Sequence, residues 1–179
     1  CNTYLSNFLS VFNGINSVGL SITFDYANTI PDAACYGKSN LSSVTIGSNI
    51  TGIGTQAFYG CTSLTSITIP SSVTNISNNA FTNCTGLTNI ICNTYLSNFP
   101  LIFNGINPVG LSITFDYANV IPDNVCDGKT NLSSVTIGSN ITSIGNFAFR
   151  YCFALTSISI PSSVTSRSEE HTSELQSPM

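Results

Sequence analysis

The chain has 179 residues, of which 42% are hydrophobic and only 7% are charged, and its formal net charge is −4. The negative charge argues against nucleic-acid binding, and no stretch approaches the roughly 20 apolar residues that a membrane-spanning helix needs. Ser, Thr and Asn therefore supply most of the polar surface. The first residue is Cys1 and the only Met is Met179, so we expect the natural start to be missing, and the absence of a signal segment carries no information.

In chain order, the sequence is a series of similar units. Leu41–Ser63 and Leu64–Gly86 are both 23 residues long, and their apolar residues fall at the same places, including an Ala-Phe-x-x-Cys motif. A fixed period of this size predicts a solenoid. The expected full units are 20–40, 41–63, 64–86, 87–110, 111–131 and 132–154, with partial units at 1–19 and 155–166.

A longer repeat is built from these units. Residues 1–74 match residues 92–165 at a constant offset of 91, with 17 differences in 74 pairs. The offset equals the summed length of the four units from Leu20 to Gly110.

Each unit opens with the pattern L-x-x-I-x-I, in which alternate residues such as Ile67 and Ile69 are apolar. This alternation predicts one short strand per unit with one buried face, and stacked units then form a parallel sheet. Turn residues such as Pro70 follow the strand. The Ala-Phe-x-x-Cys motif favours a single helical or 3₁₀ turn on the other side of the coil.

Three units depart from the pattern. In 20–40 and 111–131, a Cys takes the Phe place and a Lys takes the Cys place; in 87–110 we expect Ile102, Phe103 and Ile106 at the Ala, Phe and Cys places. We expect a local bulge and a weaker stack there. The two Lys side chains either reach out to solvent along the turn or pair with Asp32 or Asp127. The Cys and Lys residues concerned are Cys35, Lys38, Cys126 and Lys129.

One unit alone buries too little to fold, so the array is stable only as an array and needs caps at its ends. The chain begins and stops within a unit, which indicates an uncapped fragment. Arg167–Ser177, RSEEHTSELQS, is similar to the translation of a common sequencing-adapter oligonucleotide. We therefore expect 167–179 to be a non-native or disordered tail, detached from the solenoid; the alternative is a native polar terminus.

The unit LTSITIPSSVTNISNNAFTNCTG closely resembles the BspA-like leucine-rich repeats, and the resemblance extends from Leu20 to Thr165. Members of that family are mostly secreted or surface-anchored proteins of bacteria and some parasitic protists. The resemblance implies a leucine-rich-repeat solenoid at the cell surface or outside the cell. Its implied partners are matrix or cell-surface proteins or glycans, with no membrane insertion of this segment.

Catalytic and metal chemistry find little support in the sequence. Outside the tail there is no His and no Glu, so neither a Ser-His-Asp nor a Cys-His arrangement is available. The seven Cys residues include no C-x-x-C motif, and we expect free thiols acting as small apolar spacers, although Cys61 and Cys84 are close enough to bridge. Asp32 and Asp123 resemble caps of the helical turn. We expect no enzyme activity, no cofactor and no metal.

The outward face of the strands is the candidate binding surface, because solenoids use their sheet face to contact partners. The preference of Thr for exposed strand positions explains much of its composition without any function. An intracellular repeat scaffold and an ice- or crystal-binding face are the alternatives. This face has no Trp and no clustered Arg, so we expect no compact hot spot on it, and the turn-side Tyr36, Tyr59 and Tyr151 are the second candidates. The strand-face residues are Thr23, Asp25, Ser43, Thr45, Ser66, Thr68, Asn89, Thr114, Asp116, Ser134 and Thr136.

Overall fold

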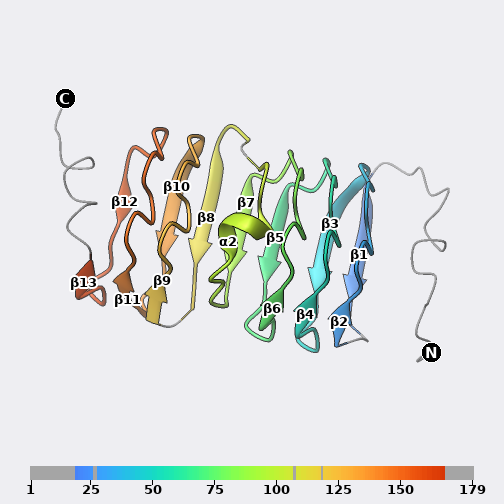
Figure 1. Cartoon of the computed structure of the whole chain (residues 1–179), viewed down its shortest axis with the longest axis horizontal. Coiled ribbons are helices and arrows are strands. Elements are labelled where there is room, and N and C mark those ends of the chain that lie inside the picture. Colours follow the sequence, from blue (N-terminus) through green and yellow to red (C-terminus); the bar gives the residue numbers. More distant parts are fainter. Residues whose placement is uncertain (1–18, 26–27, 107, 118, 168–179) are drawn as a thin grey trace.

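The alternating residues at the start of each unit form strands that stack side by side into one elongated row of coils (Figure 1). The computed structural model describes residues 19–25, 28–106, 108–117 and 119–167. All strand pairs in this part of the chain are parallel, as successive coils of a solenoid require. The first strand of each coil is β1 (Leu20–Phe24), β3 (Leu41–Ile46), β5 (Ser66–Ile69), β7 (Asn89–Cys92), β8 (Leu111–Phe115), β10 (Leu132–Ile137) and β12 (Ile158–Ser159).

A second row of shorter strands follows the first around most coils, and the sequence had not predicted it. These strands form two further parallel ladders, β2-β4-β6 and β9-β11-β13. The last strand reaches Arg167, one residue beyond the expected end of the solenoid, and 168–179 lie outside the described residues. Their bounds are β2 (Thr29–Ile30), β4 (Gly52–Ile53), β6 (Asn75–Ile76), β9 (Asn119–Ile121), β11 (Ile141–Ile144) and β13 (Ser166–Arg167).

Helix contributes little to the fold. The coil 87–110 carries the short helix α2 (Phe99–Ile102), with a Pro in its first turn and buried Phe99 and Ile102. Within the described ranges, no helix combines the length and the apolar composition needed to cross a bilayer.

The remainder of each coil, which contains the Ala-Phe-x-x-Cys motif and which we call the turn segment, is held by two kinds of backbone hydrogen bond. In coil 41–63, Tyr59 N donates to Gln56 O and Cys61 N donates to Phe58 O, the i→i−3 pattern expected for a 3₁₀ turn. The amides that alternate with these donate to the next coil instead: Phe58 N bonds to Ala80 O at 2.8 Å and Gly60 N bonds to Thr82 O at 2.9 Å. The segment is therefore a run of turns tied to its neighbour, and the predicted helical turn is not continuous.

The Phe places of successive coils form a buried aromatic column. The rings of Phe58 and Phe81 stack with centroids 4.9 Å apart, and Phe81 and Phe103 stack at 5.2 Å. Phe81 N donates to Ile102 O just as Phe58 N donates to Ala80 O, so the alignment expected for the irregular coil 87–110 is confirmed. All three rings are fully buried.

Where a Cys interrupts this column, a strand Phe fills the gap. Coils 20–40 and 111–131 have Cys35 and Cys126 at the Phe place, and both end their first strand with Phe24 or Phe115, where other coils have Ile or Cys. The ring of Phe115 reaches Phe149 of the next coil, 6.4 Å between centroids, and Phe24 reaches Phe58 at 5.8 Å. Because each coil then holds one Phe in either of two places, the packed volume is kept, and the expected weakening of the stack is offset.

This exchange predicts that the two places are coupled. Cys126→Phe alone should overpack the core and lower the free energy of unfolding by about 1–3 kcal/mol. Phe115→Ile alone should leave a cavity and cost roughly 1–3 kcal/mol. The double variant has Ile in the strand and Phe in the turn segment, as coil 64–86 does. Its free energy of unfolding should exceed the value predicted by adding the two single effects by at least ~1 kcal/mol. Urea unfolding of the four proteins measures this coupling, and strictly additive effects would contradict it.

Candidate functional site

The strand face has the regular arrangement that the sequence predicted. Strand register places one row of Ser and Asn residues beside a row of Thr residues, about 4.8 Å apart along each row. Asn89 and Thr114 are half-buried and the other predicted face residues are exposed. In the larger ladder, Ile91 interrupts the Thr row between Thr68 and Thr114. The aligned pairs are Ser21 with Ser43, Thr23 with Thr45, Ser66 with Asn89, Asn89 with Ser112, Ser112 with Ser134, and Thr114 with Thr136.

The Asp residues at the edge of this face pack against glycines of the following coil. A Cβ atom added at Gly47 would lie 2.5 Å from Oδ1 of Asp25, and one at Gly138 would lie 2.8 Å from Oδ1 of Asp116. Both Asp side chains remain exposed. Glycine is therefore required beside each of them because the carboxylate occupies the space of a side chain.

Asp32 and Asp123 bind a backbone amide, but one in the next coil. Oδ1 of Asp32 accepts a hydrogen bond from Thr55 N, and Oδ1 of Asp123 accepts one from Asn146 N, both at 2.6 Å. The expected capping of their own turn is wrong. These carboxylates join neighbouring coils, so they are structural.

The Cys places have a polar role that the sequence did not reveal. Each thiol donates to the carbonyl at the Phe place of the preceding coil: Cys61 to Cys35 O, Cys84 to Phe58 O and Cys152 to Cys126 O, at 3.0–3.2 Å. Burial raises the pKa of the Cys152 thiol to about 11, so at neutral pH it is protonated and able to donate. A thiol held in this form is a poor nucleophile.

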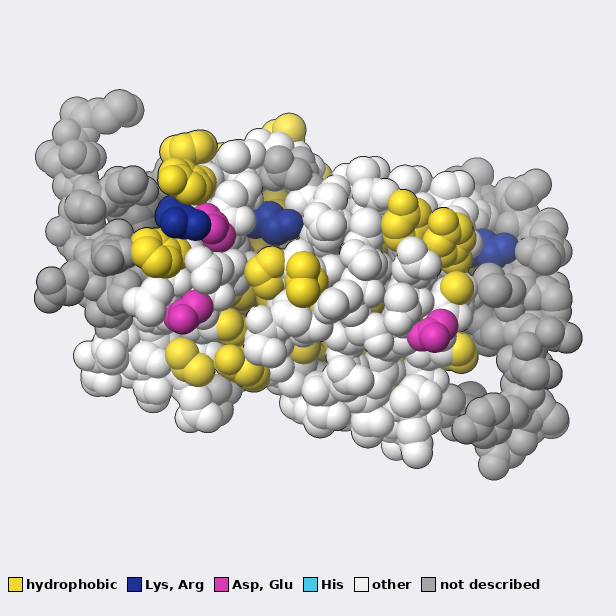
Figure 2. All heavy atoms as spheres, in the orientation of Figure 1, with side chains coloured by type: hydrophobic (Ala, Val, Ile, Leu, Met, Phe, Trp, Pro, Cys, Tyr) yellow, Lys and Arg dark blue, Asp and Glu magenta, His cyan; other side chains and the backbone are white. Residues whose placement is uncertain are grey.

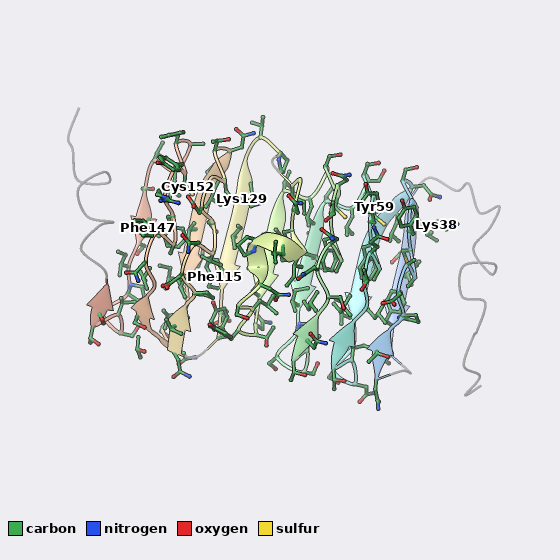
Figure 3. All side chains as sticks on the ribbon, viewed as in Figure 1. Lys38, Tyr59, Phe115, Lys129, Phe147 and Cys152 are labelled. Atoms are coloured by element: carbon green, nitrogen blue, oxygen red, sulfur yellow. The ribbon has the colours of Figure 1, made fainter. Side chains whose placement is uncertain are left out.

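Lys129 takes the same place and makes the same contact with a stronger donor. Its Nζ donates to Phe103 O at 3.1 Å and to Ile106 O at 3.3 Å. Neither arrangement expected for Lys129 forms, because the ammonium turns inward to carbonyls while Asp127 pairs with Arg150. Burial lowers the pKa of Lys129. Figure 3 shows Lys129 and Cys152 on neighbouring coils.

Among the described residues, the buried thiols are candidates for metal ligands or nucleophiles. All six described Cys residues are buried and unbridged, while Cys1 lies outside the described residues. Across 19–25, 28–106, 108–117 and 119–167, no three His, Cys, Asp or Glu side chains come together in a way that could hold a metal ion.

The most distinctive side-chain group lies on the turn segments of coils 111–131 and 132–154. The Arg150 guanidinium forms a two-point ion pair with Asp127, with Nε donating to Oδ1 at 3.0 Å. The guanidinium also lies 4.6 Å from the ring centroid of Phe147 and 5.1 Å from that of Tyr151. The Tyr151 ring contacts Phe153 with centroids 5.9 Å apart. We call these five residues the aromatic–Arg cluster.

The aromatic–Arg cluster is accessible to solvent, and Tyr151 is its one member that the sequence analysis named as a candidate binding residue. Phe153 is 77% exposed and Tyr151 is 49% exposed. Figure 2 shows hydrophobic side chains gathered around basic and acidic ones at the left end of this side of the molecule, the end that carries β10 and β11 in Figure 1. The cluster lies on turn segments, so the prediction of no compact hot spot on the strand face stays a prediction. Arg150 and Asp127 are 23 residues apart in the sequence and meet only because the coils stack.

Two residues of the cluster have unfavourable backbone conformations. The position of Tyr151 in each coil has a left-handed φ, and the other described coils place Gly or Asn there: Gly37, Gly60, Asn83, Gly105 and Gly128. Tyr151 adopts φ 59° and Phe147 adopts φ 54°. Large side chains are costly in this region. An internal comparison of these positions is the signal that could have identified the cluster from sequence.

The two other Tyr candidates form a separate group. Tyr36 and Tyr59 stack with centroids 4.9 Å apart and nearly parallel rings, and Asn83 Nδ2 donates to the Tyr59 hydroxyl at 2.9 Å. Tyr59 lies toward the opposite end of the solenoid from Phe147 (Figure 3). The structure therefore does not bring Tyr36 and Tyr59 together with Tyr151.

The parallel coils, their buried Phe and Cys columns and the polar strand face together define a leucine-rich-repeat solenoid. The family model described as BspA type Leucine rich repeat region matches residues 12–107 and 113–175 in six copies. The chain belongs to this family. Solenoids of this class are repeat-based binding scaffolds.

Solved structures of bacterial leucine-rich repeat proteins have the same fold. A leucine-rich repeat protein from Eubacterium ventriosum is 30% identical with a TM-score of 0.66, over 84% of this chain and 41% of that one. A leucine-rich repeat protein from Bacteroides ovatus is 19% identical with a TM-score of 0.53, over 82% of this chain and 44% of that one. This chain spans less than half the length of either protein. A search of curated proteins found no match.

Burial of Lys129 predicts a specific pH dependence of stability. Its pKa is lowered in the folded state from the ordinary 10.5, so the folded protein releases this proton at a lower pH than the unfolded chain does. The contribution of Lys129 to stability should therefore rise with pH between the lowered pKa and 10.5. The buried thiols, whose pKa values are raised, contribute in the opposite sense in the parent and in the variant alike. Lys129→Met should remove only the Lys129 contribution, so the stability of the parent relative to the variant should increase with pH. Urea unfolding of both proteins across the alkaline range measures the difference, and parallel pH curves would contradict the assignment.

The left-handed backbone at Tyr151 predicts a stabilising substitution. Tyr151→Gly should relieve about 1–2 kcal/mol of backbone strain and lose about 0.5–1 kcal/mol of cation–π interaction with Arg150. The net expectation is a gain of about 0.5–1 kcal/mol from these two terms.

The matched control is Tyr36→Gly, at a position outside the left-handed region, where Gly should destabilise by at least ~0.5 kcal/mol. Thermal or urea unfolding compares the two variants with the parent protein. A loss of stability in Tyr151→Gly as large as in Tyr36→Gly would show that Tyr151 is not strained.

Proposed function

We propose that this chain is a non-catalytic binding segment of a secreted or cell-surface adhesion protein, which contacts protein or glycan partners through its strand face. The observation that carries the proposal is the register of the strands, which aligns small hydroxyl and amide side chains in rows on the exposed side of the sheet. Membership in the BspA-type family supports the extracellular setting.

The chemistry of this face favours many weak contacts. Its side chains are short, mostly uncharged and able both to donate and to accept hydrogen bonds. Such groups contribute little individually, and useful avidity comes from engaging many coils at once. The edge carboxylates Asp25 and Asp116 recur four coils apart and supply the negative charge of this face. The interruption of the Thr row at Ile91 is unfavourable for an ice- or crystal-binding surface, which requires an unbroken lattice of hydroxyls.

Single Lys substitutions on two separate strands test the proposal. Thr45→Lys on β3 and Thr136→Lys on β10 place a long charged side chain in the row without putting two ammonium groups side by side. Each should lower adhesion to surfaces coated with matrix protein or glycan by about threefold to tenfold, equivalent to about 1 kcal/mol. The double variant should show roughly the product, because distant sites act independently.

Thr62→Lys is the matched control, because Thr62 is an exposed Thr on a turn segment. It should leave adhesion unchanged if the strand face is the contact surface. Circular dichroism melting confirms that each variant is folded. Full adhesion by the folded double variant would rule out the strand face as the binding surface.

A further inference from the structure

The two copies of the long repeat within this chain differ mainly on one surface. In the coil that contains the aromatic–Arg cluster, residues 132–142 are identical to residues 41–51, so the strand-face residues of this coil are the same in both copies. The turn segment that follows is different. Seven of the 12 positions in 143–154 differ from 52–63: Gly52/Ser143, Thr55/Asn146, Gln56/Phe147, Tyr59/Arg150, Gly60/Tyr151, Thr62/Phe153 and Ser63/Ala154.

The differences replace one interacting pair by another. Tyr36 and Tyr59, which stack in the first copy, correspond to Asp127 and Arg150, which form an ion pair in the second. Each pair joins the same two positions on neighbouring coils. The replacement has therefore kept a contact between the coils while changing the chemistry of the surface.

The remaining differences add exposed aromatic area despite a cost in the backbone. Gln56 and Gly60 occupy left-handed positions in the first copy, and Phe147 and Tyr151 occupy the equivalent positions in the second. Neither core packing nor backbone preference explains large rings at these positions, because neither ring belongs to the hydrophobic core and left-handed φ disfavours both. Strained residues that persist on a surface indicate a functional constraint.

We propose that the aromatic–Arg cluster is a compact docking site for another protein, one that presents an apolar side chain to Tyr151 and Phe153. This site lies on the turn segments and does not depend on the strand face. Tyr and Arg are the residues that most often anchor protein–protein contacts. Arg150 is held in place by Asp127 and by two rings, so little conformational entropy is lost when a partner binds.

The sequence differences favour a protein partner over a glycan. Thr62, Ser63 and Gln56 of the first copy carry hydrogen-bonding groups suited to sugar hydroxyls, and the second copy has Phe153, Ala154 and Phe147 in their places. At these three positions the surface has lost polar donors and acceptors and gained apolar area, while the charged groups gained at Asp127 and Arg150 pair with each other. Since Asp127 neutralises Arg150, the matching segment of the partner needs an apolar anchor more than a charge.

Random-sequence peptides displayed on phage are the probe. Selection on the parent protein, with counter-selection on Phe153→Thr, should yield peptides enriched in Leu, Ile, Phe or Pro. Binding of the corresponding synthetic peptides should weaken by about tenfold or more in both Phe153→Thr and Tyr151→Gly. It should stay within about twofold of the parent in Thr45→Lys, which alters only the strand face.

Tyr151→Gly separates docking from folding, because it is expected to bind more weakly while unfolding at a higher temperature. Three results would overturn the proposal: no peptides selected above the counter-selection, selected peptides without apolar enrichment, or peptide affinity that does not change in Phe153→Thr and Tyr151→Gly.

Electrophoresis through gels containing soluble starch or galactomannan tests the alternative that the cluster binds a glycan. Retardation that is lost in Phe153→Thr would assign the cluster to a glycan instead. Loss of peptide binding with adhesion through the strand face intact would leave the proposed function standing.

Discussion

Each coil is held to the next by the backbone amides of its turn segment, and the rest of the structure depends on this arrangement. Alternate amides bond within the coil and the others bond to the neighbouring coil. Left-handed residues recur at the same places in successive coils, and their amides are among those that bond to the neighbour, as Ala33 N does to Thr55 O and Gly37 N to Tyr59 O. Gly and Asn adopt this conformation at low cost. Gly, Asn, Ala and Gln occupy most of these places, and Phe147 and Tyr151 are the large aromatic exceptions.

The repeat and its strand face could be predicted from sequence because they depend on periodicity. Alternation at Ile67 and Ile69 is enough to determine which side of the strand is buried, and a constant period aligns the rows. The second strands could not be predicted in the same way. Several, such as Gly52–Ile53, have only two residues, which is too short for any alternation to be seen.

The aromatic–Arg cluster and the Lys129 contact were missed for a different physical reason. Arg150 meets Asp127, and Lys129 meets Phe103 O, across a coil boundary. A contact with a backbone carbonyl cannot be recognised from residue types, because every residue has a carbonyl. The sequence analysis therefore considered only solvent and a carboxylate as partners for Lys129. The thiol of Cys152 makes an equivalent contact with Cys126 O. The Cys and Lys places are thus one structural position, defined by a donor that reaches the preceding coil.

The exchange of Phe between the strand and the turn segment has a consequence for how the array can change in length. A coil with Phe115 and Cys126 and a coil with Ile69 and Phe81 each supply one Phe ring from these two places. A gene segment that encodes whole coils can therefore be copied or deleted by unequal recombination without leaving a hole or an excess of side chains at the new junction. The 91-residue repeat in this chain is the product expected of such an event, and it leaves each added copy free to acquire a turn surface of its own.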